Sequence, residues 1–210
     1  MNILYINLDK REDRLAHVQK ELDKLGWLHN AQRFPAVAMK NGAIGCTISH
    51  IKCIEIAREK RWPHVIILED DIEFTNPELF LKQFNLFIQR HSSMWDVVLL
   101  AGNNMIPYSA NDQVSVQIYN CQTTTGYMVQ SHYYDTMIKN MREGLGKLLK
   151  EPAKKSEYAI DRYWLQLQKR DSWFLIVPLT VVQREDYSDI EGKQTDFRNY
   201  MLNLNKAYRT

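Results

Sequence analysis

The stretch His64-Val65-Ile66-Ile67-Leu68-Glu69-Asp70-Asp71 decides the fold of this 210-residue chain. Residues 64–68 form a short apolar run rich in β-branched side chains, which is typical of a central strand covered on both faces. Three carboxylates follow it directly. Because ligands of open α/β sheets bind beyond the carboxyl ends of the strands, we expect a functional site where this strand ends.

The residues before this stretch alternate between strand and helix patterns. Residues 3–7 read as a buried strand, and apolar residues then recur at helical spacing over residues 15–25, closed by Gly26 where a helix cap belongs. Residues 33–37 can form a second strand, and a second helix is expected to begin near Thr47 or Ser49, since both residue types are good N-caps. The pattern predicts two β-α units that lead into the strand at residue 64.

The residues after this stretch are less regular. A helix is expected after residues 75–78, which read Thr-Asn-Pro-Glu, a cap followed by proline in the first turn. Further strands are predicted over residues 96–100, 114–119, 125–129 and 174–177, and further helices near residues 131–142 and 160–169. Residues 101–113 form a segment too long for a simple connection, so we interpret it as a binding loop.

This order of elements predicts an α/β fold with a central, mostly parallel sheet flanked by helices. No segment is rich enough in linker residues to divide the chain. We therefore expect a single domain over residues 1–190. Residues 191–210 are expected to form a C-terminal tail that packs on this domain or is partly mobile.

Composition excludes several classes of protein. The chain carries 27 basic and 25 acidic residues, a net charge of +2, without the one-signed face that nucleic-acid binding needs. Its three cysteines form no C-x-x-C pair, and on one helix Cys46 and Cys53 would lie roughly 10 Å apart, too far for a disulfide. No apolar run reaches the ~18 residues of a membrane span. We expect a soluble cytoplasmic protein, at most peripheral to a membrane.

The three carboxylates indicate a metal site. Adjacent ionised groups repel one another where water is partly excluded, and a cation offsets that cost. In an extended segment, Glu69 and Asp71 project to one side and Asp70 to the other, so the first two can share a metal while Asp70 bonds elsewhere, for instance to a ribose hydroxyl. Oxygen ligands favour Mn²⁺ or Mg²⁺ over zinc. The alternative is a solvated acidic turn without a metal.

Three blocks of sequence carry a resemblance to a known family. They are Ile6-Asn7-Leu8-Asp9-Lys10-Arg11 with Asp13-Arg14, then Gly42-Ala43-Ile44-Gly45-Cys46-Thr47-Ile48-Ser49-His50, and then Ile67-Leu68-Glu69-Asp70-Asp71. Weaker similarity continues at Thr124-Thr125-Gly126-Tyr127, at Ile160-Asp161-Arg162-Tyr163 and up to Ser188-Asp189-Ile190. In this order and spacing the chain resembles glycosyltransferase family 25, the family of lipooligosaccharide and procollagen galactosyltransferases.

The resemblance implies a GT-A-type nucleotide-sugar fold and a metal-dependent, inverting transferase. Its donor would be a UDP-hexose, most often UDP-galactose. Its acceptor would be a glycan terminus of lipooligosaccharide or a hydroxylysine of a collagen-type chain. The chain departs from the family at Ala36-Val37-Ala38-Met39, where an aspartate and a glycine usually follow the valine. We therefore do not expect an aspartate contact to the nucleotide there.

The resemblance also assigns roles to single residues. Asn7, Leu8, Arg11 and Arg14 follow the first strand and would contact the nucleotide, with Asp70 on the ribose and a divalent metal on Glu69 and Asp71.

An inverting transferase needs a base for the acceptor hydroxyl, and Asp161 matches the family position for it. Asp161 can equally be a helix cap or a further metal ligand. His50 can contact the donor or acceptor, or act as a structural hydrogen bonder. Tyr127 can line the sugar pocket or belong to the core.

Two other functions are compatible with these residues. A metal-dependent nucleotidyltransferase shares an acidic strand end but releases pyrophosphate instead of UDP. A non-catalytic relative would keep the fold as a module that binds UDP-sugars. The sequence leaves the acceptor, the donor sugar and the oligomeric state open.

Overall fold

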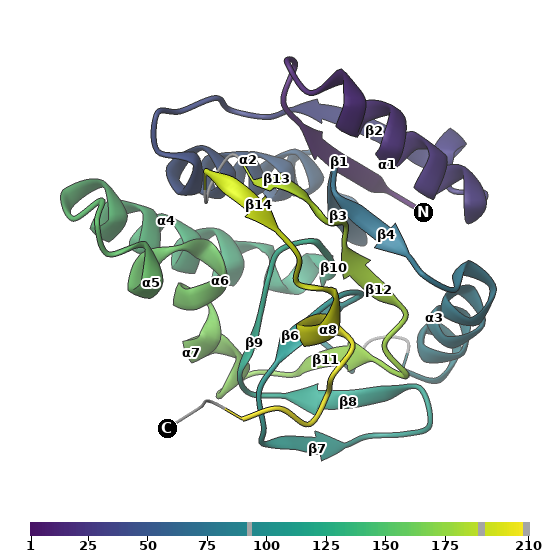
Figure 1. Ribbon diagram of the computed structural model, residues 1–210. Coiled ribbons are helices and arrows are strands. Elements are labelled where there is room, and N and C mark those ends of the chain that lie inside the picture. Colours follow the sequence, from purple (N-terminus) through teal and green to yellow (C-terminus); the bar gives the residue numbers. More distant parts are fainter. Residues whose placement is uncertain (92–93, 189–191, 208–210) are drawn as a thin grey trace.

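The computed structural model of the protein describes residues 1–91, 94–188 and 192–207. At its centre lies an eight-stranded sheet in the order β2-β1-β3-β10-β5-β11-β8-β7 (Figure 1). These strands are β1 (Ile3–Asn7), β2 (Ala31–Pro35), β3 (His64–Glu69), β5 (Val97–Leu99), β7 (Tyr108–Ala110), β8 (Ser115–Ile118), β10 (Gly126–Gln130) and β11 (Trp173–Ile176). Within this sheet β10 and β8 run against the other strands. The predicted α/β fold with a mostly parallel sheet is confirmed.

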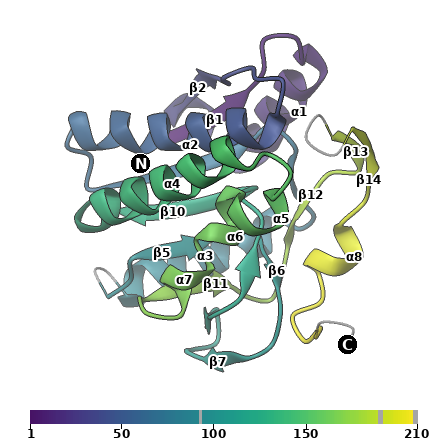
Figure 2. The same ribbon diagram turned by 90° about the vertical axis from the view of Figure 1, so that its left-hand side faces the viewer.

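Helices cover both faces of the sheet (Figures 1 and 2). One face packs against α1 (Glu12–Lys24) and α3 (Pro77–His91), and the other against α2 (Gly42–Glu59) and α4 (Tyr134–Lys150). Alternate residues of the central strands enter different cores, because successive side chains of a strand point to opposite faces. Ile66 and Leu68 of β3 pack in the core with α1 and α3, whereas Val65 and Ile67 pack in the core with α2 and α4.

The start of α2 differs from the sequence prediction. The helix begins at Gly42, and the side chain of Asn41 caps it by accepting a hydrogen bond from the backbone N–H of Ala43 at 3.1 Å. Thr47 and Ser49, the predicted caps, lie inside the helix, where their hydroxyls donate to backbone carbonyls one turn earlier. The prediction was wrong because a residue of the preceding turn already satisfies the free N–H groups.

Short elements complete the fold. They are η1 (Leu28–Asn30), β4 (Ile72–Phe74), β6 (Asn103–Asn104), β9 (Cys121–Gln122), η2 (Ser131–Tyr133), α5 (Lys155–Tyr158), α6 (Ile160–Tyr163), α7 (Leu165–Gln168), β12 (Val181–Gln183), β13 (Asp186–Ser188), β14 (Lys193–Thr195) and α8 (Arg198–Met201). The predicted loop over residues 101–113 contains β6 and β7, and the helix predicted over residues 160–169 is divided into α6 and α7.

The C-terminal residues pack along the rest of the molecule. The backbone N–H of Ile106 donates to the carbonyl of Lys206 at 3.0 Å, and the Asn104 amide donates to the carbonyl of Leu204 at 3.2 Å. The predicted domain boundary at residues 190–191 lies outside the described residues. The three cysteines are free, and over the described ranges no helix is long and apolar enough to cross a membrane.

Candidate active site at the carboxyl end of strand β3

The chain turns directly after Glu69, the last residue of β3. Asp70 and Asp71 therefore lie in a turn and not in the extended strand that the sequence analysis assumed for them. Asp70 and Asp71 are 7% and 3% exposed, and both accept hydrogen bonds from the same Arg14 nitrogen, Nη1, at 3.0 Å. The expectation that Glu69 and Asp71 point to one side and Asp70 to the other was wrong at this point, because a turn does not keep the two-residue alternation of a strand.

Arg14 neutralises part of this acidic cluster. Its guanidinium is buried between Asp70, Asp71 and Asp186, and it also donates to the carbonyl of Tyr187 at 3.0 Å. Helix α1 thus places the Arg14 cation at the end of β3, and β13 contributes Asp186 as a third carboxylate beside it. Arg14 was predicted to contact a nucleotide. The hydrogen bonds described for it are to Asp70, Asp71, Asp186 and Tyr187.

Asp71 keeps one oxygen without a partner. Its Oδ2 accepts from Arg14 and from the Gln183 amide at 2.8 Å, whereas Oδ1 is buried and has no hydrogen-bond partner within the described ranges. Burial, with the nearby charge of Glu69, raises the pKa of Asp71 to about 7. A buried carboxylate oxygen with no donor costs free energy, and a divalent cation would offset that cost. The oxygens present at Asp71 therefore fit a hard metal ion.

Glu69 occupies a different environment. Its Oε1 accepts hydrogen bonds from Thr124 at 2.6 Å, from His50 Nε2 at 3.1 Å and from the Cys46 thiol at 3.5 Å. Burial acts to raise the pKa of Glu69, but the hydrogen bond and charge of His50, with the bonds from Thr124 and Cys46, bring it below its ordinary value. Glu69 therefore remains ionised, and no partner is described for its second oxygen.

His50 and Tyr127 stand behind Glu69. Both side chains are fully buried, and the Tyr127 hydroxyl lies 2.8 Å from His50 Nδ1. His50 thus bridges Tyr127 and Glu69, which fixes the orientation of its ring. The structure places Tyr127 in the wall behind the site and not on the surface that a sugar would touch.

Cys46, His50 and Glu69 also place a thiol, an imidazole nitrogen and a carboxylate oxygen within 4.8 Å of one another, close enough to hold a metal ion. The pKa of the Cys46 thiol is raised well above its usual range by burial and by Glu69, so the thiol is protonated and acts as a donor. Without a bound ion, these three residues form a hydrogen-bond network centred on Glu69.

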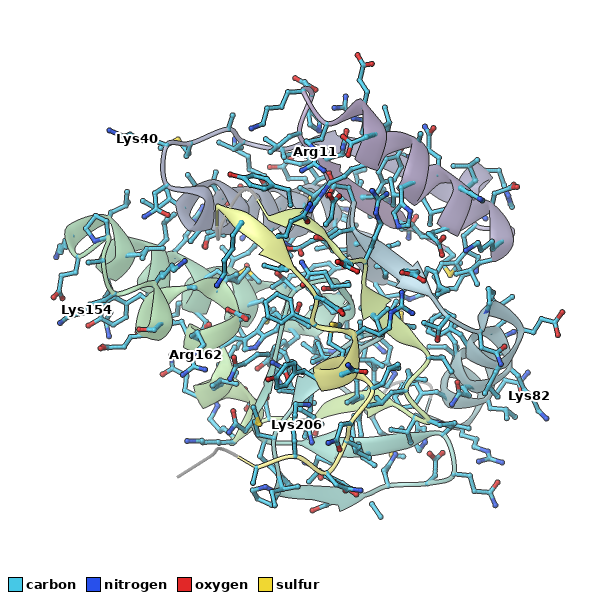
Figure 3. The ribbon with its side chains drawn as sticks, viewed as in Figure 1. Arg11, Lys40, Lys82, Lys154, Arg162 and Lys206 are labelled. Atoms are coloured by element: carbon cyan, nitrogen blue, oxygen red, sulfur yellow. The ribbon has the colours of Figure 1, made fainter. Side chains whose placement is uncertain are left out.

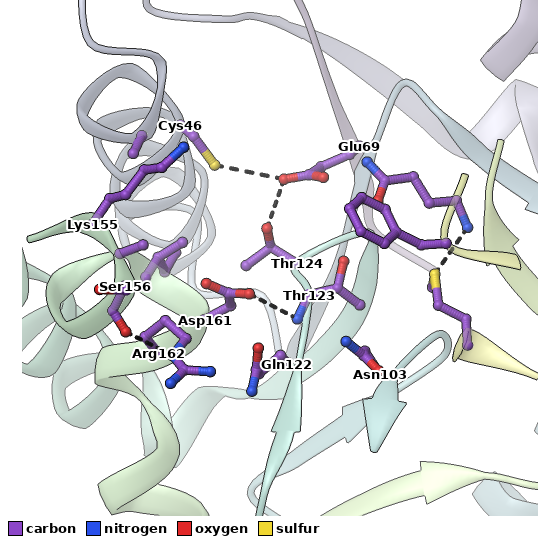
Figure 4. Close-up of a pocket in the computed structure, with 16 residues that line it drawn as sticks. Cys46, Glu69, Asn103, Gln122, Thr123, Thr124, Lys155, Ser156, Asp161 and Arg162 are labelled. Atoms are coloured by element: carbon purple, nitrogen blue, oxygen red, sulfur yellow. Dashed lines mark hydrogen bonds between the residues drawn. The ribbon is translucent and has the colours of Figure 1, made fainter. Parts of the chain in front are cut away.

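Two cavities meet at Glu69. The first, which we name the Arg14 cavity, has a volume of about 320 Å³ and is lined by Leu8, Lys10, Arg11, Arg14, Lys40 and Asp71, among others. The second, the Asp161 cavity, has a volume of about 360 Å³ and is lined by Asn103, Thr123, Asp161, Arg162 and Phe197, among others (Figure 4). Cys46, Glu69 and Gln183 line both. Molecules bound in the two cavities would therefore both lie next to Glu69.

Asp161 lies across the second cavity from Glu69 (Figure 4). Its Oδ2 accepts a hydrogen bond from the backbone N–H of Thr123 at 3.1 Å. Burial raises the pKa of Asp161 above its ordinary value, although the Thr123 bond opposes the shift. Asp161 is therefore a stronger base than an exposed aspartate. The alternative of a helix cap was wrong, because the N-cap position of α6 is Ala159 and no side chain caps this helix.

The remaining predicted site residues lie at the end of β1 or directly after it. Asn7 is buried and donates from Nδ2 to Asp70 at 2.8 Å, so it positions that carboxylate. Leu8 and Arg11 line the Arg14 cavity. Figure 3 shows Arg11 beside the C-terminal segment, where its guanidinium pairs with Asp186 at 2.9 Å. The structure thus brings Asn7, Leu8 and Arg11 to the same edge of the sheet as Asp70.

Sequence reasoning missed three residues of this site. Gln183 lines both cavities and bonds to Asp71 from 112 positions away. Thr124 makes the shortest hydrogen bond to Glu69, and Asp186 pairs with Arg14. Thr124 and Gln183 lie at positions of weaker similarity to the family, and Asp186 lies just before another such position. No local pattern assigned them a role, because contacts between distant segments leave no trace in a short window of sequence.

Comparison with known proteins identifies the class to which this fold and site belong. The protein is a glycosyltransferase. The profile of glycosyltransferase family 25, described as LPS biosynthesis proteins, matches residues 36–154. This match spans more than half of the chain, which therefore belongs to glycosyltransferase family 25. No curated protein sequence matches it significantly.

Several solved structures show partial similarity to this chain at low sequence identity. A mannose-1-phosphate geranyltransferase from Thermus thermophilus is 8% identical, with 83% of this chain and 72% of that chain covered and a TM-score of 0.49. A glycosyltransferase involved in glycosylation of the major capsid of PBCV-1 is 12% identical, with 84% and 91% covered and a TM-score of 0.47. A Drosophila galactosyltransferase in complex with manganese, UDP-Gal and xylobiose is 13% identical, with 64% and 50% covered and a TM-score of 0.36. None of these three similarities reaches a TM-score of 0.5.

Proposed function

We propose that this glycosyltransferase moves a hexose, galactose in the first instance, from a UDP-sugar to an acceptor hydroxyl with inversion at the anomeric carbon. The observation that carries the proposal is the pair of cavities that meet at Glu69. A transfer reaction needs two binding sites that share one reacting centre. The Arg14 cavity suits the donor nucleotide, and the Asp161 cavity suits the acceptor.

The Arg14 cavity has the chemistry of a nucleotide diphosphate site. Lys10, Arg11 and Lys40 contribute cationic side chains, and Leu8 and Met39 contribute apolar surface. Guanidinium and ammonium groups attract phosphate oxygens, whereas apolar side chains suit the faces of a base. Asp70, held by Asn7 and Arg14, is our candidate for a ribose hydroxyl contact.

We propose that Asp71 and Glu69 hold a divalent cation, Mn²⁺ or Mg²⁺. The unpartnered Oδ1 of Asp71 and the free second oxygen of Glu69 are the ligand atoms available for it. When bound, such an ion offsets the negative charge that develops on a departing diphosphate. Arg14 holds the Asp71 carboxylate in place from the other oxygen.

Inversion requires the acceptor hydroxyl to attack from the face opposite the nucleotide, while a base takes its proton. Asp161 lies in the cavity on the far side of Glu69 from Arg14, and its raised pKa suits it to accept that proton. The Thr123 N–H holds one carboxylate oxygen, which leaves the other for the acceptor. We propose Asp161 as the general base.

The family description supports an acceptor in lipopolysaccharide biosynthesis. We further propose that residues 1–190 form one catalytic domain and that the residues after 191 pack on it as a cover. The C-terminal hydrogen bonds to Asn104 and Ile106 support that arrangement.

UDP release tests the proposal. UDP-galactose, UDP-glucose and UDP-N-acetylglucosamine are each incubated with the enzyme and Mn²⁺, with EDTA as the control, and the anomeric configuration of the product is read by NMR. We expect metal-dependent UDP release and a β-linked product. Pyrophosphate release instead of UDP would identify a nucleotidyltransferase, and binding of the donor without turnover would identify a non-catalytic relative.

A pair of variants tests the metal site. Asp71→Asn should lower kcat/KM at least about hundredfold and weaken Mn²⁺ binding measured by calorimetry, because a metal ligand is lost. Asp135→Asn makes the same chemical change at an exposed carboxylate on α4 and should leave both quantities unchanged. Equal Mn²⁺ affinity in the two variants would contradict the metal assignment.

A further inference from the structure

We propose that the C-terminal segment supplies part of the acceptor site and that the ring of Phe197 is a platform for a pyranose, which makes the acceptor a saccharide. This inference rests on the proposed function, in which the Asp161 cavity receives the acceptor. Phe197, Asp161, Gln183 and Arg162 all lie outside residues 36–154, the range that the family profile matches. The profile match therefore does not extend to these four residues.

Phe197 combines exposure with a position in the cavity wall. It precedes α8 directly, its side chain is 36% exposed, and it lines the same cavity as Asp161. A large aromatic side chain left accessible to solvent inside a cavity offers an apolar face to a ligand. The C–H groups on one face of a pyranose are suited to such a ring.

The segment that carries Phe197 is fixed to the body of the protein. Arg198 makes two hydrogen bonds to the Glu73 carboxylate, at 2.9 and 2.8 Å. Met201 is buried, and its sulfur accepts a hydrogen bond from the backbone N–H of Gln183 at 3.2 Å. Because α8 is anchored on both sides, the Phe197 ring is held in place before a ligand binds, which reduces the entropy lost on binding.

Polar side chains suited to sugar hydroxyls face the same space. Asn103, Gln122 and Thr123 line the cavity, and Figure 4 shows the Asn103 amide nitrogen directed toward Gln122. The side-chain oxygen of Asn103 is buried and has no hydrogen-bond partner in the described part of the chain. An aromatic ring facing amides and hydroxyls can bind the apolar face and the hydroxyl edge of one sugar together.

The cavity fits hydroxylysine less well. A hydroxylysine side chain has no ring to stack on Phe197, and it carries an ammonium group on the carbon next to its hydroxyl. The cavity wall carries two cations, Lys155 and Arg162, and two carboxylates, Glu69 and Asp161, so the comparison of the two acceptors rests on the Phe197 ring and not on charge (Figure 4). Between the two acceptors that the family offers, the cavity favours the glycan.

The test measures acceptor binding and transfer separately. The probes are p-nitrophenyl β-glucoside, β-galactoside and β-N-acetylglucosaminide and free hydroxylysine, each titrated by calorimetry into enzyme with UDP and Mn²⁺. We expect at least one glycoside to bind and Phe197→Ala to weaken that binding and raise its KM about tenfold, within the range of an aromatic contact. Phe197→Tyr should restore affinity to within threefold of the wild type.

Tyr200→Ala is the matched control. Tyr200 is 57% exposed on the same short helix and does not line the cavity, so this variant should bind the glycoside as the wild type does. Thermal melts of all variants separate loss of folding from loss of binding, and Phe197→Leu replaces Phe197→Ala if the latter unfolds.

Three results would overturn the inference: glycoside affinity unchanged in Phe197→Ala, no glycoside binding at all, or a higher kcat/KM for hydroxylysine than for any glycoside. Absence of UDP release from every donor, with Phe197-dependent glycoside binding intact, would overturn only the proposed reaction.

Discussion

Arg14 should be the residue on which the stability of the acidic cluster depends. Its guanidinium is the shared partner of Asp70, Asp71 and Asp186 at 3.0 to 3.1 Å, and its side chain is only 11% exposed. Arg14→Gln would leave Asp70 and Asp71 close together without their cation, whereas Asp186 would keep its ion pair with Arg11. Removing one partner of a buried ion pair costs roughly 3–5 kcal/mol, because the other charge is left buried and uncompensated.

That cost can be measured as a change in melting temperature. For a domain of this size, each 1 kcal/mol lowers Tm by roughly 2–4 °C, so Arg14→Gln should melt roughly 6–20 °C below the wild type. Scanning calorimetry at pH 8 without divalent cations gives this difference. Adding Mn²⁺ should restore more of the Tm in Arg14→Gln than it adds to the wild type, since the ion replaces part of the missing positive charge.

Arg198→Gln provides the comparison. Arg198 also makes a two-pronged contact with a carboxylate, Glu73, but its side chain is 40% exposed, so its loss should cost no more than about 1 kcal/mol. If Arg14→Gln were no less stable than Arg198→Gln, the carboxylates of the cluster would not need an internal cation. The electrostatic argument for a metal beside Asp71 would then fail as well.

Three further predictions concern the base, a close contact and acid stability. Asp161→Asn should lower kcat for transfer by about 10²–10⁴ while the KM for the donor changes little, as steady-state kinetics would show, and a wild-type kcat would rule this residue out as the base. Gly45→Ala should unfold or strongly destabilise the protein in thermal melts, because an added Cβ would lie 2.3 Å from the backbone oxygen of Val37, whereas Gly146→Ala meets no atom within 4 Å and should be tolerated. Burial would raise the pKa of the Asp112 carboxyl, but hydrogen bonds hold it at about 2, so the stability it contributes is complete above pH 4 and is lost as the pH falls toward 2. Asp112→Asn should therefore cost up to about 2 kcal/mol in urea unfolding at pH 7 and almost nothing near pH 2, and an equal cost at both pH values would contradict this assignment.

Local sequence patterns predicted the elements that are defined by local forces. The β-branched run at residues 64–68 became the central strand β3, and Gly26, with φ of 65°, follows the end of α1. The strand follows from the β preference of its side chains, and the end of the helix follows from the ease with which glycine adopts a positive φ. Both can be read from a short window of sequence. The start of α2 was misplaced because two good N-cap residues inside the helix competed with Asn41 in the same window.

The candidate site could be predicted only in part, because the directions of its side chains depend on contacts that a short window of sequence does not contain. The place of Glu69, Asp70 and Asp71 at the end of a buried strand follows from the sequence. The directions of their side chains do not follow from the sequence. The chain turns after Glu69, and Asp70 and Asp71 both accept hydrogen bonds from Arg14. For Tyr127 the sequence left two alternatives, the sugar pocket and the core, and the structure places it in the core with its hydroxyl bonded to His50.

The sequence by itself determined the α/β order of elements, the acidic end of β3 and the family of the chain, since each is written in contiguous residues. Tertiary structure alone decided that Gln183 reaches Asp71, that Asp186 reaches Arg14 and that Phe197 joins Asp161 in one cavity. Such pairings between distant segments depend on how the whole chain packs, because these side chains meet only after both cores have formed.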